Sequence, residues 1–292
     1  MTEFTSEMPL SMTESLPRKC MHRKLLELVD GEPQLVYVAN FGNLGDALIA
    51  HATYEFLARH GLKYHVARST DDVEDACVLV AGGGNLIEGR YTDLSAFLQR
   101  CGARNRIILL PHSIVGNADL FRSIVGRAHI FAREAMTYRF LSDIGVPQER
   151  VFLADDMAFS LSDELRGAKP TTKRGVLLCL REDVESARPF NCPKSNFDVS
   201  KLIIHHWDDP VVAHHASQIL LKIVGDYEIV VTDRLHVAIA GALLGCQVKL
   251  LPNNYYKNRG VFELSMRGFP NVSFIDFNEI RDLWHPDGSQ IP

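Results

Sequence analysis

The 292-residue sequence lacks any apolar run near the roughly 18 residues that a membrane-spanning helix needs. It also lacks a run of lysines or arginines, and its net charge of −5 argues against a general nucleic-acid-binding protein. Residues 1–16 include acids and no apolar segment of signal-peptide length. These absences predict a cytoplasmic protein with no nucleic-acid partner.

The cysteines show no pairing pattern. The chain has six cysteines, and none of them forms a C-x-x-C pair. Cys77, Cys179 and Cys246 lie in or beside apolar, strand-like runs, where a thiol serves as a small core side chain. We therefore expect free cysteines in a reducing compartment and no disulfide framework.

Several cofactor and catalytic signatures are missing as well. The sequence has no G-x-G-x-x-G fingerprint, no Walker G-K-[ST] and no G-x-S-x-G elbow. The histidine pairs at 205–206 and 214–215 do not fit a helix-borne H-x-x-x-H ligand pair, and no cysteine or second acidic motif completes them. We therefore expect no bound metal, no nicotinamide cofactor and no serine triad.

What the sequence does contain is a regular alternation of strand-like and helix-like segments. Such alternation predicts parallel sheets with helices on both faces. The stretch 162–174 is charged, contains glycine and proline, and is typical of a linker between two such series. The expected strands are 35–39, 64–68, 77–81, 107–110, 128–132, 151–153, 175–180, one within 198–205, 228–232, 247–251 and 272–275. The expected helices are 18–30, 47–60, 91–100, 134–141, 211–224, 234–244 and 277–284.

This organisation predicts two open α/β units behind a short N-terminal extension. We place the extension at residues 1–30, the first unit at 31–160 and the second at 161–292. Ligands of open α/β sheets bind beyond the carboxyl ends of the strands. Two such units facing each other would therefore enclose a ligand cleft between those ends.

One strand–helix stretch, residues 228–244, concentrates positive charge where local electrostatics disfavours it. Thr232 or Asp233 can cap the helix, yet its first turn carries Arg234 and His236. A cation near a helix N-terminus loses roughly 0.3–1 kcal/mol. The placement favours a site for an anion, to which free backbone N–H groups would contribute. The alternative is that Asp233 pairs with Arg234 and His236 only packs.

Two glycine-containing loops follow predicted strands. Gly42-x-x-Gly45 and the run 82–84 would let the backbone approach a ligand closely. Each is equally compatible with a tight turn into the next element. Asp46 is placed to cap the helix 47–60.

Further polar residues follow other strands. Arg181 comes directly after the strand 175–180, in a position topologically equivalent to that of Arg234. Lys257 and Arg259 lie in an aromatic and amide-rich loop, and His112 follows a proline. The alternative for each cation is a solvated charge at a strand end, and for His112 a turn residue.

Together these motifs resemble the polysaccharide pyruvyl transferase family. The resemblance covers roughly residues 35–265. Its most specific part is the segment 233–236, Asp-Arg-Leu-His. The other matching pieces are the segments 40–46, 82–85, 133–134 and 155–156, and Lys257 after two tyrosines.

The resemblance implies a glycosyltransferase-B-like fold, in which two Rossmann-like domains face each other across a cleft. Residues 31–160 would form the acceptor side and residues 161–292 the donor side. Members of this family transfer pyruvate from phosphoenolpyruvate to a sugar as a ketal, in exopolysaccharide or cell-wall glycan synthesis. Phosphoenolpyruvate would be a co-substrate, with no further cofactor. The acceptor would be a saccharide, either free or lipid-linked. In the second case the protein would contact the inner face of the membrane.

The chemistry of such a donor agrees with the residues that the motifs supply. Arginine forks bind carboxylate and phosphate groups, and histidine is the usual acid–base group near neutral pH. The resemblance implies catalytic roles for His236, Arg234 and Arg181. It implies donor binding by Arg234, His236, Arg181, Lys257 and Leu235, and acceptor binding by Asn40, Gly42, Asn43, Asp46, Gly83, Gly84, Asn85 and His112.

Two other functions stay open at this point. A glycosyltransferase that uses a sugar nucleotide could share the fold, because fold does not determine function. A non-catalytic module that binds a glycan or an anion could use the same basic cleft.

Overall fold

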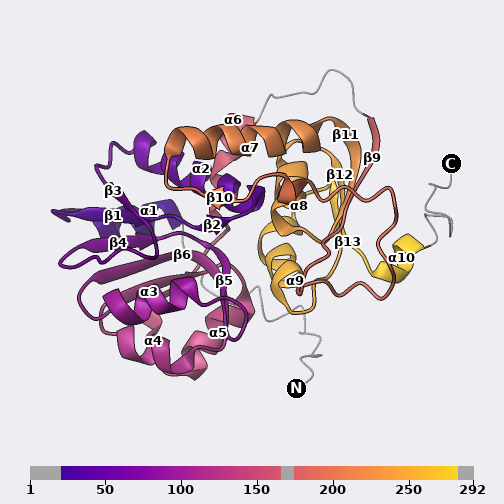
Figure 1. Cartoon of the computed structure of the whole chain (residues 1–292). Helices are drawn as coiled ribbons and strands as arrows, with labels where there is room; N and C mark the ends of the chain where they lie inside the picture. Colours follow the sequence, from indigo (N-terminus) through magenta and orange to yellow (C-terminus); the bar gives the residue numbers. More distant parts are fainter. Residues whose placement is uncertain (1–20, 166–173, 282–292) are drawn as a thin grey trace.

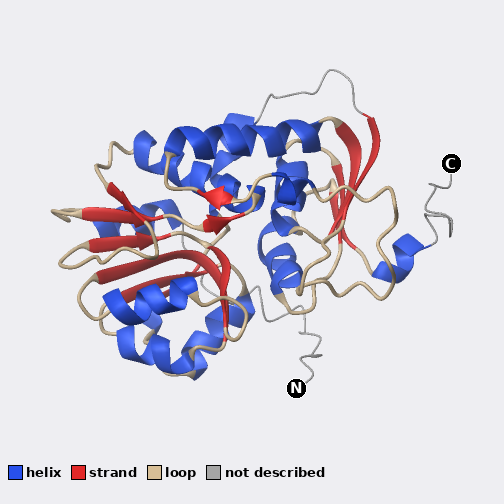
Figure 2. Cartoon of the chain, in the orientation of Figure 1, coloured by secondary structure: helices blue, strands red, loops and turns tan. Residues whose placement is uncertain are grey.

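The computed structural model describes residues 21–165 and 174–281, which form two parallel sheets and the helices around them (Figures 1 and 2). The first sheet has seven strands, with β3, β1, β4, β6, β7 and β8 adjacent in that order and β5 paired to β6. Its strands are β1 (Leu35–Val38), β3 (His65–Ala67), β4 (Cys77–Val80), β5 (Gly83–Ile87), β6 (Arg106–Val115), β7 (Ala128–Ala132) and β8 (Val151–Leu153).

Helices cover both faces of the first sheet (Figure 1). Helices α1 (Met21–Val29) and α2 (Leu44–Arg59) pack on one face, and α3 (Asp93–Cys101), α4 (Ala118–Ile124) and α5 (Ala135–Asp143) on the other. Successive side chains of a strand point to opposite faces. Accordingly Val36 and Val38 pack with α3–α5, whereas Tyr37 packs with α1 and α2.

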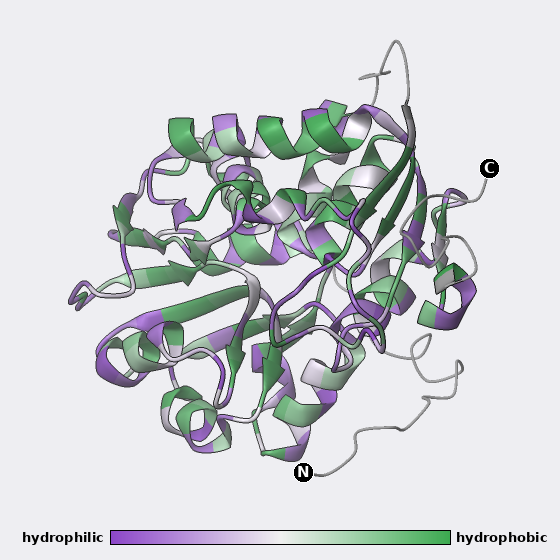
Figure 3. Ribbon diagram, turned by 45° about the vertical axis from the view of Figure 1, so that its right-hand side comes forward, coloured by the Kyte–Doolittle hydropathy of each residue, from purple (hydrophilic) through white to green (hydrophobic). Residues whose placement is uncertain are grey.

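The second sheet has four parallel strands in the order β13-β12-β11-β9. These are β9 (Arg174–Cys179), β11 (Tyr227–Thr232), β12 (Gln247–Leu250) and β13 (Val272–Phe274). Helices α7 (Pro210–Gly225) and α8 (Leu235–Leu243) share a core cluster with one face, and α10 (Phe277–Arg281) packs on the other. Figure 3 shows the apolar character of the strands in both sheets.

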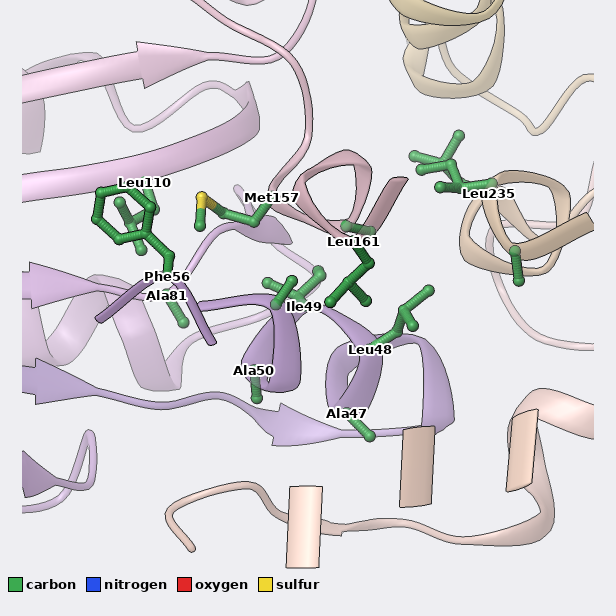
Figure 4. Packing of buried hydrophobic residues seen from close by; sticks show 14 of the residues in the cluster. Ala47, Leu48, Ile49, Ala50, Phe56, Ala81, Leu110, Met157, Leu161 and Leu235 are labelled. Atoms are coloured by element: carbon green, nitrogen blue, oxygen red, sulfur yellow. The ribbon is translucent and has the colours of Figure 1, made fainter. Parts of the chain in front are cut away.

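One hydrophobic core runs through both sheets. The largest cluster of buried side chains contains residues of α1, α2 and the first sheet together with α7, α8 and the second sheet. Helix α2 lies at the centre of this core, and most of its 16 residues are buried. In Figure 4, Leu48 and Ile49 of α2 lie beside Leu161 of the 3₁₀-helix η3 (Met157–Leu161). The two sheets therefore share a core.

A short antiparallel ribbon also joins the two halves. Strand β2 (Phe41–Gly42) pairs with β10 (His205–His206). The buried Trp207 side chain donates to the Gly42 carbonyl at 3.2 Å, and its backbone N–H donates to the Asn40 carbonyl at 3.1 Å. The remaining short elements are η2 (Gln148–Arg150), α6 (Ser162–Leu165), η4 (Val199–Leu202), α9 (Lys257–Val261) and the π-helical turn η5 (Phe262–Met266).

The α/β class and the parallel sheets are confirmed, but several segments differ from the prediction. The segment 198–205 is not a strand of the second sheet; it contains η4 and the start of β10, which pairs with the first half. Residues 83–85 begin β5 instead of forming a loop. Helix α4 was not predicted. Of the expected linker 162–174, residues 162–165 form α6 and residues 166–173 lie outside the described part of the chain.

The caps of two helices also differ from the prediction. Asn43, not Asp46, caps α2: the Asn43 side chain accepts from the Gly45 N–H, and Asp46 accepts from the Asn43 N–H. This reciprocal capping box starts the helix three residues earlier than the apolar pattern suggests. Arg234, not Thr232 or Asp233, is the N-cap residue of α8.

Membrane spans and metal sites can be sought only among the described residues. None of the helices in this part of the chain is long and apolar enough to cross a membrane. Within residues 21–165 and 174–281, no three His, Cys, Asp or Glu side chains are grouped so as to hold a metal ion. The domain division stays a prediction, although α1 of the expected N-terminal extension packs into the shared core.

Candidate functional site

A cavity of about 430 Å³ lies between the two sheets, where the carboxyl ends of their strands face each other. Its walls come from the segments that follow β1, β7, β9 and β11, and from the starts of α2, α8 and α9. It is lined by residues 38–43, 45, 46, 69, 84, 85, 90–94, 133, 181, 183, 185, 200, 234–237 and 257.

The cavity brings together nearly all of the residues that the sequence motifs single out. Of the residues that were given a catalytic or binding role, Gly83 and His112 do not line it. The ones that do are Asn40, Gly42, Asn43, Asp46, Gly84, Asn85, Arg181, Arg234, Leu235, His236 and Lys257. The predicted cleft is therefore present, and residues far apart in the sequence form it.

His112 lies inside β6 and is completely buried. Burial and the nearby Arg133 hold its pKa well below the ordinary value. The sequence predicts that the strand ends at Leu110, before Pro111. In the structure the pairing register shifts between Leu109 and His112, and such an irregularity can accommodate a proline within a sheet. In this position His112 does not reach a ligand in the cavity, so its predicted acceptor contact has no support from the structure.

Arg234 is paired, but not with Asp233. Its guanidinium bonds Asp198 through Nε at 3.1 Å and Nη2 at 2.5 Å, and its Nη1 lies 2.8 Å from Asp183. Arg181 bonds the same Asp183 through Nε at 2.7 Å. Burial alone would raise the pKa of Asp183, but the two arginines hold it below its ordinary value. Asp183 thus bridges both predicted donor-binding arginines.

Glu185 connects Arg181 to Lys257. Its carboxylate lies 2.6 Å from Arg181 Nη1 and 2.5 Å from Lys257 Nζ, and accepts from the Tyr91 hydroxyl at 2.6 Å. Burial lowers the pKa of Lys257 to about 8, with Glu185 opposing the shift and Arg181 adding to it. Lys257 is therefore a cation whose charge can change within a few pH units of neutrality.

Asp233 has a supporting role beneath the arginines. Its Oδ1 accepts from the Arg181 backbone N–H at 2.8 Å, and its backbone carbonyl accepts from the Asn258 side chain at 2.7 Å. Burial raises the pKa of Asp233 to about 6, although Arg181 and Arg234 oppose the shift. The alternative in which Asp233 neutralises Arg234 directly is wrong.

His236 points its ring toward a buried ion pair. Its Nε2 lies 3.4 Å from Oδ2 of Asp156, which also bonds Arg133 Nη1 at 2.6 Å. Burial would raise the pKa of Asp156, but His236 and Arg133 hold it far below the usual range. A carboxylate can only accept, so the imidazole N–H lies at Nε2 when His236 is neutral. Asp156 therefore orients the ring as carboxylates orient catalytic histidines.

The first turn of α2 leaves room for this histidine. A Cβ at Gly45 would lie 2.7 Å from Nδ1 of His236, which is too close for any other residue without a shift of the ring. A Cβ at Gly84 would lie 3.0 Å from Arg133 Nη2 and 3.4 Å from the Lys257 side chain. These two glycines permit close approach between the halves.

Arg133 is a site residue that the sequence analysis did not assign. It is buried, lines the cavity, and donates from Nε to Ser113 at 3.0 Å in addition to its pair with Asp156. It directly follows β7, just as Arg181 and Arg234 follow strands of the second sheet. The same topological rule applied to the first sheet could have identified it.

The predicted acceptor residues of the first half make many bonds to each other. Asn40 donates to the Gly82 carbonyl at 2.7 Å and accepts from Asn85 at 3.1 Å, while Asn43 and Asp46 form the capping box. These bonds fix two loops as one wall of the cavity. Their acceptor role stays a prediction.

The aromatic and amide-rich loop predicted around Lys257 and Arg259 contains the start of α9. Lys257 and Asn258 are buried, and Asn258 also donates to the Leu251 carbonyl at 2.9 Å. Arg259 points elsewhere: its guanidinium lies 4.3 Å from the centre of the Phe274 ring and does not line the cavity. Only Lys257 of the two basic residues reaches the site.

Comparison with known proteins identifies the family. A family model described as polysaccharide pyruvyl transferase matches residues 43–255. EpsO of Bacillus subtilis (strain 168), a protein named as a pyruvyl transferase, is 21% identical over 86% of this chain and 91% of its own length. The solved structure of an uncharacterised protein from Klebsiella pneumoniae subsp. pneumoniae NTUH-K2044 is 33% identical, with a TM-score of 0.78 over 88% of this chain and 99% of that chain. The resemblance inferred from the motifs is confirmed, and the chain belongs to the polysaccharide pyruvyl transferase family.

Proposed function

We propose that the protein transfers the pyruvyl group of phosphoenolpyruvate to two hydroxyls of a saccharide, forming a cyclic ketal and releasing phosphate. The observation that carries the proposal is the convergence of Arg181, Arg234 and Lys257 with His236 on one cavity, in a chain of this family. Phosphoenolpyruvate presents a carboxylate and a phosphate on a small frame. Arginine forks and an ammonium suit both groups.

We further propose that the two sheets act as two Rossmann-like domains in a glycosyltransferase-B-like arrangement. Residues 161–292 would hold the donor, because Arg181, Arg234 and Lys257 all belong to that half. The loops of residues 31–160 would hold the saccharide on the opposite wall. The start of α8 lines the cavity, and the free backbone N–H groups of a helix N-terminus suit a donor phosphate.

In the proposed reaction His236 is the general acid. Protonation of the donor methylene carbon makes C2 electrophilic, and one sugar hydroxyl adds there. A second hydroxyl then displaces phosphate and closes the ketal. In total the methylene gains one proton, the two hydroxyls lose theirs, and the remaining proton leaves with phosphate. Asp156 supports this role of His236 by holding the imidazole in one orientation.

The setting of the reaction is also a proposal. The protein would act in the cytoplasm on an acceptor that is either free or lipid-linked, and a lipid-linked acceptor would bring it to the inner face of the membrane. The proposed reaction uses side chains of this protein and phosphoenolpyruvate, and none of its steps requires a metal or a nicotinamide.

The decisive experiment measures phosphate release from phosphoenolpyruvate with a panel of galactosides, glucosides and mannosides, and analyses the products by mass. A pyruvylated sugar formed together with stoichiometric phosphate is the expected result. Stabilisation by sugar nucleotides in place of phosphoenolpyruvate would indicate a glycosyltransferase. Ligand binding without any phosphate release would indicate a non-catalytic module.

A further inference from the structure

The three cations proposed to bind the donor are already engaged by carboxylates of the protein itself. Arg181, Arg234 and Lys257 face Asp183, Glu185 and Asp198, so three positive and three negative groups balance. A donor that carries its own anionic groups would therefore meet a neutral cluster. The donor can bond these three cations through its own anionic groups only if at least one of the carboxylates leaves.

Two of the three carboxylates are fixed in place. Asp198 has an exposed side-chain fraction of 8% and accepts from the Ser200 hydroxyl as well as from Arg234. Glu185 has an exposed fraction of 4% and contacts Arg181, Lys257 and Tyr91 together. Removing either would leave several buried polar groups without partners, which is strongly unfavourable.

Asp183 differs from both, because 31% of its side chain is exposed. Its carboxylate lies between the two guanidinium groups, bonding Arg181 through Nε at 2.7 Å and Nη2 at 3.3 Å and Arg234 through Nη1 at 2.8 Å. It lies on the segment 180–198, which connects β9 to η4 and borders the cavity. Water can solvate this carboxylate if another anion takes its place between the arginines.

We propose that Arg181 and Arg234 form a subsite specific for a planar carboxylate, that Asp183 occupies this subsite in the empty protein, and that the donor's carboxylate displaces it. The exchange replaces one carboxylate by another, so the charge balance around the arginines is preserved. The phosphate of the donor then lies toward Lys257 and the start of α8. Identifying the incoming carboxylate as that of phosphoenolpyruvate rests on the proposed function, but the subsite itself does not.

The test compares the anion affinities of the wild type and of Asp183→Asn by calorimetry. Asparagine keeps the oxygen that accepts from the Glu185 N–H at 3.1 Å, but it no longer competes as a charged fork. Because an internally blocked site binds ligand in proportion to its open fraction, we expect pyruvate and phosphoenolpyruvate to bind the variant about tenfold more tightly. Inorganic phosphate, which has no carboxylate, should gain less than twofold.

Glu182→Gln is the matched control. Glu182 is the exposed neighbour of Asp183, and the change removes the same charge beside Arg181. It should leave all three affinities unchanged. Thermal unfolding of each variant checks the fold, and Asp183→Ser replaces Asp183→Asn if the latter does not fold.

The proposal is overturned if Asp183→Asn binds pyruvate no more tightly than the wild type, or if phosphate gains as much as pyruvate. The first result would mean that Asp183 only positions the arginines. The second would mean that Asp183 acts only through its charge, without selectivity for a carboxylate. A gain for pyruvate without any turnover of phosphoenolpyruvate would instead leave the subsite intact and overturn the proposed function.

Discussion

Lys257 combines burial with a position at the cavity, and this makes its protonation state a determinant of donor binding. Its pKa is lowered to about 8 by burial. A bound anion would favour the ammonium form, so the donor should bind most tightly while Lys257 is protonated. The donor affinity is therefore highest below pH 8 and decreases as the pH rises through that value.

We predict that the association constant for phosphoenolpyruvate falls by up to about tenfold per pH unit above pH 8. The range from pH 7 to 9.5 isolates the lysine, because phosphate esters have their second pKa near about 6. Calorimetric titrations across this range measure the effect. In Lys257→Met the affinity should be low and independent of pH; an unchanged pH profile in this variant would assign the titration to another group.

His236 provides the second prediction at the level of single residues. Glutamine at this position can still donate a hydrogen bond but cannot transfer a proton near neutral pH. We expect His236→Gln to bind phosphoenolpyruvate within a few-fold of the wild type and to lose about 10²-fold or more in turnover. Calorimetry and phosphate release measure the two quantities separately. Near-normal turnover would reduce His236 to a binding residue and direct the search for the acid to Lys257.

At the level of elements, the start of α2 shapes the site because Gly45 has no side chain there. An alanine at Gly45 would meet His236 Nδ1 at 2.7 Å and Asn43 Oδ1 at 3.0 Å. Alanine is about 1 kcal/mol more favourable than glycine inside a helix. This gain opposes the cost of the close contacts, so the free energy of unfolding should change little. We expect turnover to fall by about tenfold or more, because an error of about 1 Å in a catalytic group can cost 10²-fold.

Gly126→Ala is the control for Gly45→Ala. A Cβ at Gly126 meets nothing within 4 Å, so this change should alter neither turnover nor the midpoint of thermal unfolding. If Gly45→Ala is as active as Gly126→Ala, then His236 does not need its present position and the assigned acid role loses its geometric basis.

The comparison of elements shows which predictions local patterns can support. Buried parallel strands such as β4 and β11 were found because their apolar, β-branched runs are unmistakable. β6 was cut short at Pro111, because the irregular pairing that accommodates a proline depends on the neighbouring strands. The pairing of β2 with β10 joins segments about 160 residues apart, as the 165-residue separation of the Gly42–Trp207 bond illustrates, and no local pattern encodes it.

The candidate site shows the same limit. The cations Arg181, Arg234 and Lys257 could be placed at one cleft because each follows a strand of a parallel sheet. Their carboxylate partners could not be paired, because Asp183 and Asp198 lie in an irregular segment whose course is set by tertiary contacts. The alternative in which Arg234 pairs with its neighbour Asp233 is wrong for the same reason.

For the whole molecule, the shared core predicts one cooperative unfolding transition. The chain has two tryptophans, and Trp207 lies at the junction of the halves. In Trp284→Phe the tryptophan fluorescence would report on Trp207 alone. We expect the midpoint of urea unfolding measured by this fluorescence to coincide with the midpoint measured by circular dichroism. Two separated transitions would show that the halves unfold independently.

Trp207 should also contribute strongly to stability. It is completely buried and bonds both Gly42 and Asn40 of the cavity wall. Replacing a buried tryptophan by alanine removes about 3–5 kcal/mol from the free energy of unfolding. We expect a loss of this size for Trp207→Ala in urea titrations, together with weaker substrate binding. A loss below about 1 kcal/mol would mean that the junction contributes little.

The central position of α2 has a consequence for how the protein is made. On the ribosome, α2 is completed about 150 residues before α7 begins, because α2 ends at Arg59 and α7 starts at Pro210. At roughly 5–20 residues per second, the nascent chain exposes the apolar surface of α2 for roughly 8–30 s before its cover arrives. A chain that stops at residue 165 should therefore aggregate or bind chaperones, which sedimentation and pull-down would detect. A soluble, folded fragment of that length would show that the early half protects itself.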